Sequence, residues 1–371
     1  MTSRWDETTV AGLTLKTRLW KGAIYERLAT PEGFATPELT DLYKEYIDGG
    51  VGAILTGYTR IVEDDIPNPD MNAIYSDDHI AGYLPLTSYA HQGGCPIFMQ
   101  LVYGGARTNV PTEGRRIWGP SAVANQRTNV VPTAMTQRDI DELISAFAQG
   151  ALRAKKAGFD GVQIHAAHGY MLSTWLCPHY NQRTDEYGGS LPNRARIILQ
   201  ILAAIKDTCG QDYPVLIKFN CTDHMQDGLT EEDSLQLIQL LEAAGIDGAE
   251  ISGGNECDPA VAAADLGPSR KKLAHHPERS SYFGEYARKL SQQVSLPIIL
   301  TGGNRFTSVM NNLLQEGAAT YFGLARSLNS EPNLPAIWKT DPDHEPPCVA
   351  CNKCFTTVGR RCSLREGTQL L

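Results

Sequence analysis

Residues 161–190 read GVQIHAAHGYMLSTWLCPHYNQRTDEYGGS, and this stretch indicates both a fold and a chemistry. Its short apolar run, 161–164, predicts a buried strand. His165, His168 and Tyr170 follow that run directly. An imidazole N–H can hold a substrate oxygen and a tyrosine hydroxyl can transfer a proton, so the three rings suit the polarisation of a carbonyl group. A single histidine would more simply cap the strand, but three such groups within six residues favour a functional site.

On both sides of this strand, short apolar runs alternate with segments whose apolar residues recur with the period of an α-helix. We expect strands at 18–24, 53–58, 96–101, 161–166, 215–220, 248–253, 297–302 and 320–325. The clearest helices are expected at 136–158, 191–210, 230–245 and 306–317, and several of them end in Gly, as left-handed C-caps do. Eight strand–helix pairs predict an α/β fold of the (β/α)₈ TIM barrel type, in which apolar parallel strands are covered on both faces.

The composition argues against several classes of protein. The chain has 371 residues, 42% of them hydrophobic, and a net charge of −9 with a pI near 5.5, which argues against a nucleic-acid surface. No apolar stretch reaches membrane-spanning length and residues 1–10 lack the apolar core of a signal peptide. Five cysteines are scattered singly, as in a reduced cytosolic protein. We therefore expect a cytoplasmic protein with a barrel over 1–340 and a Cys-rich tail over 341–371.

Polar residues at the predicted strand ends form the candidate site, because the active site of a TIM barrel lies there. Gln100 ends the third strand and Lys218 lies near the end of the fifth. A buried lysine without a partner costs several kcal/mol, so Lys218 should meet an anion or an electron-rich ring. After strands seven and eight, TGGNR (301–305) and GLAR (323–326) offer backbone N–H groups and a guanidinium, which predict a phosphate site. Its residues are Gly302, Gly303, Ala325 and Arg326.

Two connections between strand and helix, 102–136 and 256–280, are long and rich in Pro, Gly, Arg and His. Loops of this length in a compact domain are usually functional, so we expect both to cover the site. Within the first, WGPSAV (118–123) indicates a short hairpin or an ordinary surface loop.

The sequence resembles a known family in several of these stretches. HAAHGY (165–170), continuing through PHYNQRTDEYGGSLPNRAR (178–196), is similar to the pattern of the Old Yellow Enzyme family of FMN-dependent NAD(P)H oxidoreductases, and Gln100-Leu101, TGGNR and GLAR occur in the family's order. The pair of histidines resembles the bacterial branch that includes 2,4-dienoyl-CoA reductase and xenobiotic reductases. The resemblance implies a barrel that binds FMN, uses NADH or NADPH as reductant and forms a homo-oligomer.

Carried over by position, the resemblance assigns each candidate a role. Gln100 and Lys218 would contact the pyrimidine edge of the flavin, and Gly303, Ala325 and Arg326 would hold its phosphate. His165 and His168 would bind the carbonyl oxygen of an enone, and Tyr170 would donate the proton. The residues implied to surround the flavin ring are Ala23, Ile24, Tyr25, Gly57 and Tyr58.

The chain also departs from the family pattern. Lys218 stands where many members have Arg, which keeps the charge but loses the bidentate fork. Tyr25 stands where many have Thr or Cys, and Tyr103 where many have a His that contacts substrate. These changes put the substrate preference in doubt.

The tail carries a second motif, CVACNKCFTTVGRRC (348–362). Thiolates separated by two residues are common metal ligands. Longer family members hold a [4Fe–4S] cluster just after the barrel, so the tail could bind such a cluster or zinc, or have a structural role only. The candidate ligands are Cys348, Cys351, Cys354 and Cys362.

The main functional hypothesis is therefore an FMN-dependent ene-reductase acting on a small enone. A second enzyme hypothesis keeps the flavin but uses another acceptor or demethylates its substrate. A third is a non-catalytic flavin or metal-binding partner protein, against which the intact trio of rings argues. A flavin-free barrel such as an aldolase is the fourth, and it would be colourless.

Overall fold

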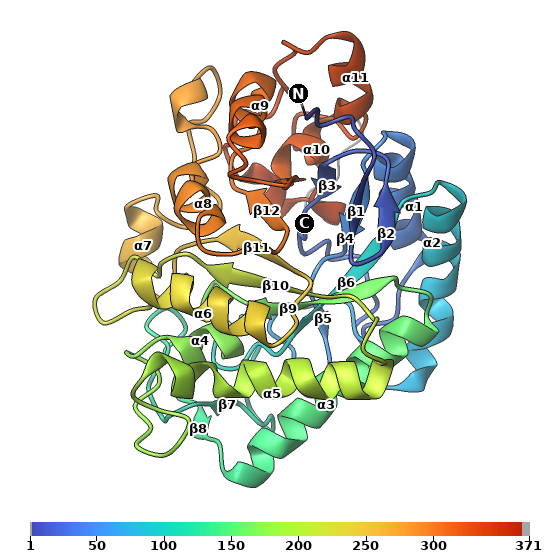
Figure 1. Ribbon diagram of the computed structural model, residues 1–371. Coiled ribbons are helices and arrows are strands. Elements are labelled where there is room, and N and C mark those ends of the chain that lie inside the picture. The colour runs from blue at the N-terminus through green and yellow to red at the C-terminus, as the bar shows by residue number, and fades with distance from the viewer. Residues whose placement is uncertain (1, 366–371) are drawn as a thin grey trace.

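The computed structural model describes residues 2–365 and contains a closed barrel of eight parallel strands (Figure 1). Each barrel strand pairs with the next along the chain, and the last pairs with the first, which closes the ring. The predicted TIM barrel is confirmed. In chain order the barrel strands are β3 (Leu19–Lys21), β4 (Ala53–Leu55), β6 (Ile97–Val102), β9 (Gly161–Ala166), β10 (Val215–Asn220), β11 (Gly248–Ser252), β12 (Ile298–Thr301) and β13 (Tyr321–Leu324).

Helices surround the barrel, and the four that the sequence predicted most clearly begin and end within two residues of the expected positions. The longest, α3, begins where the Thr136 side chain accepts from the Asp139 N–H while the Asp139 carboxylate accepts from the Thr136 N–H, a capping box. The helices around the barrel are α1 (Pro37–Asp48), α2 (Ile80–Gln92), α3 (Gln137–Lys156), α5 (Leu191–Cys209), α6 (Glu231–Ala243), α8 (Gly284–Ser291), α9 (Thr307–Gln315), α10 (Arg326–Ser330) and α11 (Leu334–Thr340).

A small hairpin that the sequence analysis did not predict closes the amino-terminal end of the barrel. It consists of β1 (Thr8–Val10) and β2 (Leu13–Leu15), which pair antiparallel. Val10 and Leu15 pack against Trp20, at the start of β3, and against other residues inside the barrel. This end of the barrel is therefore filled with apolar side chains.

The long connections contain short elements. In the first, β7 (Trp118–Gly119) pairs in parallel with β8 (Thr133–Ala134), so the predicted hairpin within 118–123 is wrong. Pro120 lacks an N–H for a hairpin ladder, and the true partner lies further along the chain. The remaining elements are β5 (Thr59–Arg60), which pairs with β6, the helices α4 (Met171–Leu176) and α7 (Pro259–Ala263), and the 3₁₀ turns η1 (Asp77–His79), η2 (Pro277–Arg279), η3 (Lys353–Thr356) and η4 (Val358–Arg360).

The segment after α11 folds back onto the barrel. Arg305, which follows β12, donates to the carbonyl oxygen of Cys348 at 2.6 Å and pairs with Glu345. Arg361 and Arg365 both pair with Glu45 on α1. Residues 366–371 of the predicted tail lie outside the described residues. Within 2–365, no helix combines the length and the apolar character needed to cross a membrane.

Candidate active site

A cavity of about 340 Å³ opens at the carboxyl ends of the barrel strands. This volume is within the range of small-molecule and cofactor sites, about 300–1,000 Å³. Both long connections contribute to its wall, as expected, through Arg107 and Arg127 from the first and Glu256 and Leu273 from the second. The predicted site residues that line it are Ala23, Ile24, Tyr25, Tyr58, Gln100, His165, His168, Tyr170, Lys218, Gly302, Gly303, Ala325 and Arg326.

Two predicted site residues lie behind the wall. The Gly57 N–H donates to Glu26 Oε1 at 2.6 Å and to the Tyr43 hydroxyl at 2.9 Å, so Gly57 supports the wall from one layer back. Tyr103 is buried, with its ring centroid 5.6 Å from that of Trp118 and its hydroxyl donating to the Arg116 carbonyl at 3.0 Å. Tyr103 thus faces the loop, and its predicted contact with substrate has no support in this geometry.

A chain of buried polar side chains crosses the floor of the cavity. Gln100 Nε2 donates to Gln163 Oε1 at 2.6 Å, and Gln163 Nε2 donates to Glu250 Oε2 at 2.8 Å. Lys218 Nζ donates to Glu250 Oε1 at 2.7 Å, so the expected anion beside this lysine is present. The strand register explains the contacts, because Gln100 lies opposite Gln163 and Lys218 opposite Glu250.

Sequence reasoning missed Gln163 and Glu250. Both are polar residues within otherwise apolar strands, GVQIHA and GAEIS. A polar residue in an apolar strand could have revealed them. A buried lysine needs a partner, and a buried carboxylate on the neighbouring strand can provide one.

The three rings that the sequence singled out meet in the cavity. The ring centroid of His165 lies 5.1 Å from that of His168 and 5.0 Å from that of Tyr170. His168 adopts φ 64°, in the left-handed region, and Gly169 follows with φ 79°. A Cβ on Gly169 would lie 2.2 Å from the Cys257 sulfur, so only glycine fits this turn.

Both histidines are neutral. Burial lowers the pKa of His165 well below its usual range, and the nearby cations of Lys218 and Arg107 lower it further. Burial also lowers the pKa of His168, with His165 as the next contributor. His165 Nδ1 accepts from the Ala167 N–H at 3.3 Å, so its Nε2 carries the proton. His168 Nε2 contacts the Ser252 hydroxyl at 2.6 Å, which leaves Nδ1 for a ligand.

Tyr170 is buried among groups that act on its hydroxyl in opposite directions. Burial raises its pKa, whereas the Arg107 cation and a hydrogen bond from Tyr58 lower it. The ring centroids of Tyr58 and Tyr170 are 5.4 Å apart, and Tyr25 stacks on Tyr58 at 5.4 Å. Tyr170 therefore remains a protonated phenol at one end of a tyrosine wall. Sequence reasoning missed Arg107, because only the fold brings its loop over Tyr170.

The opposite end of the cavity contains the glycine turn after β12. Gly302 and Gly303 have φ of 127° and 76°, and a Cβ on Gly303 would lie 2.8 Å from the Tyr282 ring. Arg326, at the start of α10, donates to Asn352 Oδ1 at 2.6 Å. A guanidinium and backbone N–H groups here, with an amide and an ammonium on the floor, suit a planar cofactor that carries a phosphate.

The tail cysteines are not arranged as a ready metal site in the described part of this structure, although their thiols lie near one another. Among residues 2–365, no group of three or more His, Cys, Asp or Glu side chains is arranged to hold a metal ion. Cys351 is exposed, whereas Cys354 is buried, and burial raises the pKa of the Cys354 thiol to about 11. A cluster or zinc at Cys348, Cys351, Cys354 and Cys362 stays a prediction. Cys348 also lines the cavity.

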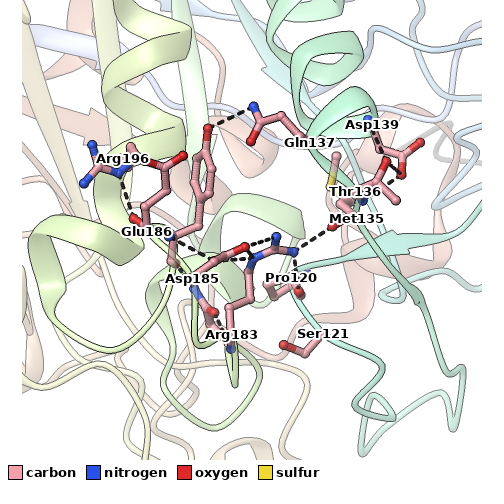
Figure 2. A network of polar contacts seen from close by, with 12 residues as sticks. Pro120, Ser121, Met135, Thr136, Gln137, Asp139, Arg183, Asp185, Glu186 and Arg196 are labelled. Atoms are coloured by element: carbon pink, nitrogen blue, oxygen red, sulfur yellow. Dashed lines mark hydrogen bonds and ion pairs between the residues drawn. The ribbon is translucent and has the colours of Figure 1, made fainter.

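The segment 178–196, a large part of the sequence resemblance, has a structural role (Figure 2). Arg183 Nη1 donates to the carbonyl oxygens of Pro120 and Met135, at 3.1 and 2.7 Å, and its Nε donates to Asp185 at 3.0 Å. Nearby, Arg196 Nε donates to the Glu186 carbonyl at 2.7 Å. The bonds to Pro120 and Met135 fasten the segment to the long connection that carries Arg107, whereas the other two hold the segment in its own shape.

Comparisons with known proteins identify the family of this chain. The family model of the NADH:flavin oxidoreductase / NADH oxidase family matches residues 8–343. The NADH oxidase of Thermoanaerobacter brockii is 30% identical over 378 residues, which are 98% of this chain and 56% of that protein. The cinnamate reductase of Clostridium sporogenes is 30% identical over 342 residues, 84% of this chain and 49% of that protein. The chain thus spans about half the length of these relatives.

A solved structure shows the same fold. The old yellow enzyme homologue from Zymomonas mobilis has a TM-score of 0.78 at 24% identity, over 93% of this chain and 94% of that chain. The family match covers nearly all of the barrel and includes the strand ends that carry the site. The chain therefore belongs to the NADH:flavin oxidoreductase family, the Old Yellow Enzyme family that its sequence resembles.

Proposed function

We propose that this protein is an FMN-dependent NAD(P)H oxidoreductase that reduces the activated C=C bond of α,β-unsaturated carbonyl compounds. The observation that carries the proposal is the meeting of His165, His168 and Tyr170 in one cavity. Two neutral N–H donors can stabilise the negative charge that develops on a carbonyl oxygen, which is worth about 3 kcal/mol for a well-placed donor. A buried phenol beside them is a proton source.

The cavity residues fit FMN. Gln100 and Lys218 would meet the pyrimidine edge, where a cation favours the reduced flavin. Gly302, Gly303, Ala325 and Arg326 would hold the phosphate. When bound, the flavin supplies the transfer of hydride from NADH or NADPH to the acceptor. The remaining wall beside the flavin ring would be Ala23, Ile24, Tyr25 and Tyr58.

The chain's own residues would then act on the acceptor. His165 and His168 hold its carbonyl oxygen, and the Tyr170 hydroxyl delivers the proton to the α-carbon. The name cinnamate reductase, given to a relative that is 30% identical, supports reduction of a conjugated C=C bond.

The test separates the two half-reactions of the holoenzyme by stopped-flow absorbance. Tyr170→Phe should slow reoxidation of the reduced protein by an enone about 10²–10⁴-fold, because it removes the proton donor. Its reduction by NADH or NADPH should stay within about twofold.

Tyr187→Phe is the matched control. Its hydroxyl bonds Gln200 and Gln137 at 3.1 and 3.2 Å, outside the cavity wall, so both half-reactions should be unchanged. Equal losses in both half-reactions of Tyr170→Phe would contradict the role of Tyr170. A flavin that is reduced but that no enone reoxidises would point to a different acceptor.

A further inference from the structure

Arg107 makes a close contact with Tyr170, and the proposed function does not yet use Arg107. Its guanidinium carbon lies 4.1 Å from the centroid of the Tyr170 ring. The Arg107 side chain is 15% exposed and lines the cavity. A cation over the face of a phenol ring attracts it and fixes its orientation, and a guanidinium keeps its charge at every working pH.

Glu256 holds Arg107 from the other side. Its Oε2 accepts from Arg107 Nη2 in an ion pair that is only partly exposed. Arg107 belongs to the connection after β6, and Glu256 to the connection after β11, so the pair joins the two long connections beside Tyr170. The other titratable groups around Tyr170 are Tyr25, Tyr58, His165 and Cys257.

We propose that Arg107 is a positioning residue that orients Tyr170 for proton transfer and stabilises the tyrosinate left behind, and that Glu256 moderates this effect. The inference rests on the proposed ene-reductase function. In the step itself, a C–H bond forms at the α-carbon, the O–H bond of Tyr170 breaks, and its electron pair stays on the phenolate oxygen. When bound, the reduced flavin would supply the hydride to the β-carbon that completes the two-electron reduction, and water would return a proton to Tyr170.

Arg107 and Glu256 shift the pKa of Tyr170 in opposite directions. Burial alone opposes formation of a phenolate, and the positive charge of Arg107 offsets it, whereas the negative charge of Glu256 adds to the burial effect. Removing Arg107 should therefore raise the pKa of Tyr170, and neutralising Glu256 should lower it. A purely structural role of the ion pair would give both variants the same defect.

The experiment compares Arg107→Met, Arg107→Lys and Glu256→Gln in the reoxidation half-reaction with an enone, measured against pH. Arg107→Met should slow this step by up to about tenfold for each unit by which the pKa of Tyr170 rises, and by more than it slows reduction by NADH or NADPH. Arg107→Lys should restore most of the rate. In Glu256→Gln, the alkaline limb of the pH profile that reports ionisation of Tyr170 should move to lower pH.

A double variant and a matched control complete the test. If Arg107 acts through Tyr170, then Arg107→Met should cause no further loss in the Tyr170→Phe background. Arg116→Met is the control, because Arg116 also lies over an aromatic ring, 4.9 Å from the Trp118 centroid, and also pairs with carboxylates, but outside the cavity wall. It should react at the wild-type rate.

Additive losses in the double variant, or pH profiles that move in the same direction in Arg107→Met and Glu256→Gln, would overturn the inference. If Tyr170→Phe slows reoxidation and Arg107→Met does not, this inference fails while the proposed function stands. If Tyr170→Phe itself has no effect, the proton-donor role fails first.

Discussion

Lys218 and Glu250 form an ion pair on the cavity floor, where their side chains are 6% and 0% exposed. Removing one partner leaves the other charge buried and unpaired, which is more damaging than losing the attraction itself. Glu250→Gln should therefore lower the free energy of unfolding by about 3–5 kcal/mol, as measured by urea denaturation. Glu285→Gln removes an exposed partner of Arg288 and should change it by less than about 1 kcal/mol. Similar values for the two variants would contradict this account.

The buried carboxyl group of Asp65 should make the free energy of unfolding depend on pH. Burial raises its pKa from 3.8 to about 7, although its Oδ2 accepts from the Gly104 N–H at 2.7 Å. The folded protein therefore binds this proton more tightly than the unfolded chain, so the contribution of Asp65 to stability is greatest below pH 4 and is lost as pH rises to about 7.

The side chain introduced by Asp65→Asn cannot ionise, so the variant does not lose stability in this way as the pH rises. Relative to the wild type, the variant should gain free energy of unfolding between pH 4.5 and pH 8, by up to about 4 kcal/mol at about 1.4 kcal/mol per pKa unit. Urea denaturation of both proteins at the two pH values measures the difference. A difference that does not change with pH would show that Asp65 is ionised in the folded protein throughout this range.

Among single residues, the sequence predicted those that lie near the carboxyl ends of barrel strands or just after them. His165, His168, Tyr170, Gln100 and Lys218 reach the cavity because the end of a strand fixes where its side chains lie. Arg107 and Glu256 are carried by long connections, whose course depends on contacts far apart in the chain, and no local pattern reveals those contacts.

At the scale of elements, Arg183 links the segment after α4 to the connection that contains β7 and β8 (Figure 2). Arg183→Met removes the donors to the carbonyl oxygens of Pro120 and Met135 and leaves those groups without this partner. A hydrogen bond to a charged group contributes about 1.5–3 kcal/mol. Backbone amides of residues 118–135 should therefore exchange hydrogen faster, roughly 10–100-fold, as measured by mass spectrometry, while amides of α3 keep their protection.

Arg153→Met provides the comparison. Arg153 lies on the surface of α3 and pairs with Asp77, which is largely exposed. Exchange in residues 118–135 should match the wild type in this variant. Equal exchange in the two variants would show that Arg183 does not hold the connection.

Long periodic elements were predictable and short ones were not. Apolar runs located all eight barrel strands, but β3 and β4 stop at Lys21 and Leu55, earlier than expected, because the chain then leaves the sheet to line the cavity. The two-residue strands β7 and β8 are too short for any period to show in the sequence. The β1–β2 hairpin could have been predicted, because a turn at Ala11 and Gly12 joins two segments in which polar and apolar residues alternate.

On the scale of the whole molecule, the tail completes the cavity. Arg305 is 5% exposed and bonds the carbonyl oxygens of Cys348 and Pro346 as well as Glu345. Arg305→Met should release this attachment, so trypsin should cleave within residues 341–365 several times faster than in the wild type, as followed by mass spectrometry. The far-UV circular dichroism of the barrel should be unchanged.

Arg288→Met is the control for this prediction, because Arg288 pairs with Glu285 and Glu316 at the surface of α8, and neither partner lies in the described part of the tail, 341–365. Its tail should be cleaved at the wild-type rate. A tail that stays resistant in Arg305→Met would assign the attachment to Glu45 and its two arginine partners instead.

The pairing of β13 with β3 joins strands about 300 residues apart, Phe322 lying opposite Leu19. On a ribosome that adds about 5–20 residues per second, the edge of β3 waits roughly 15–60 s for its second neighbour. During that interval β3 has β4 on one side only, and the growing sheet has two unpaired edges that another nascent chain could join. The brevity of β3, three residues long, leaves little edge for such pairing and so protects the protein during its own synthesis.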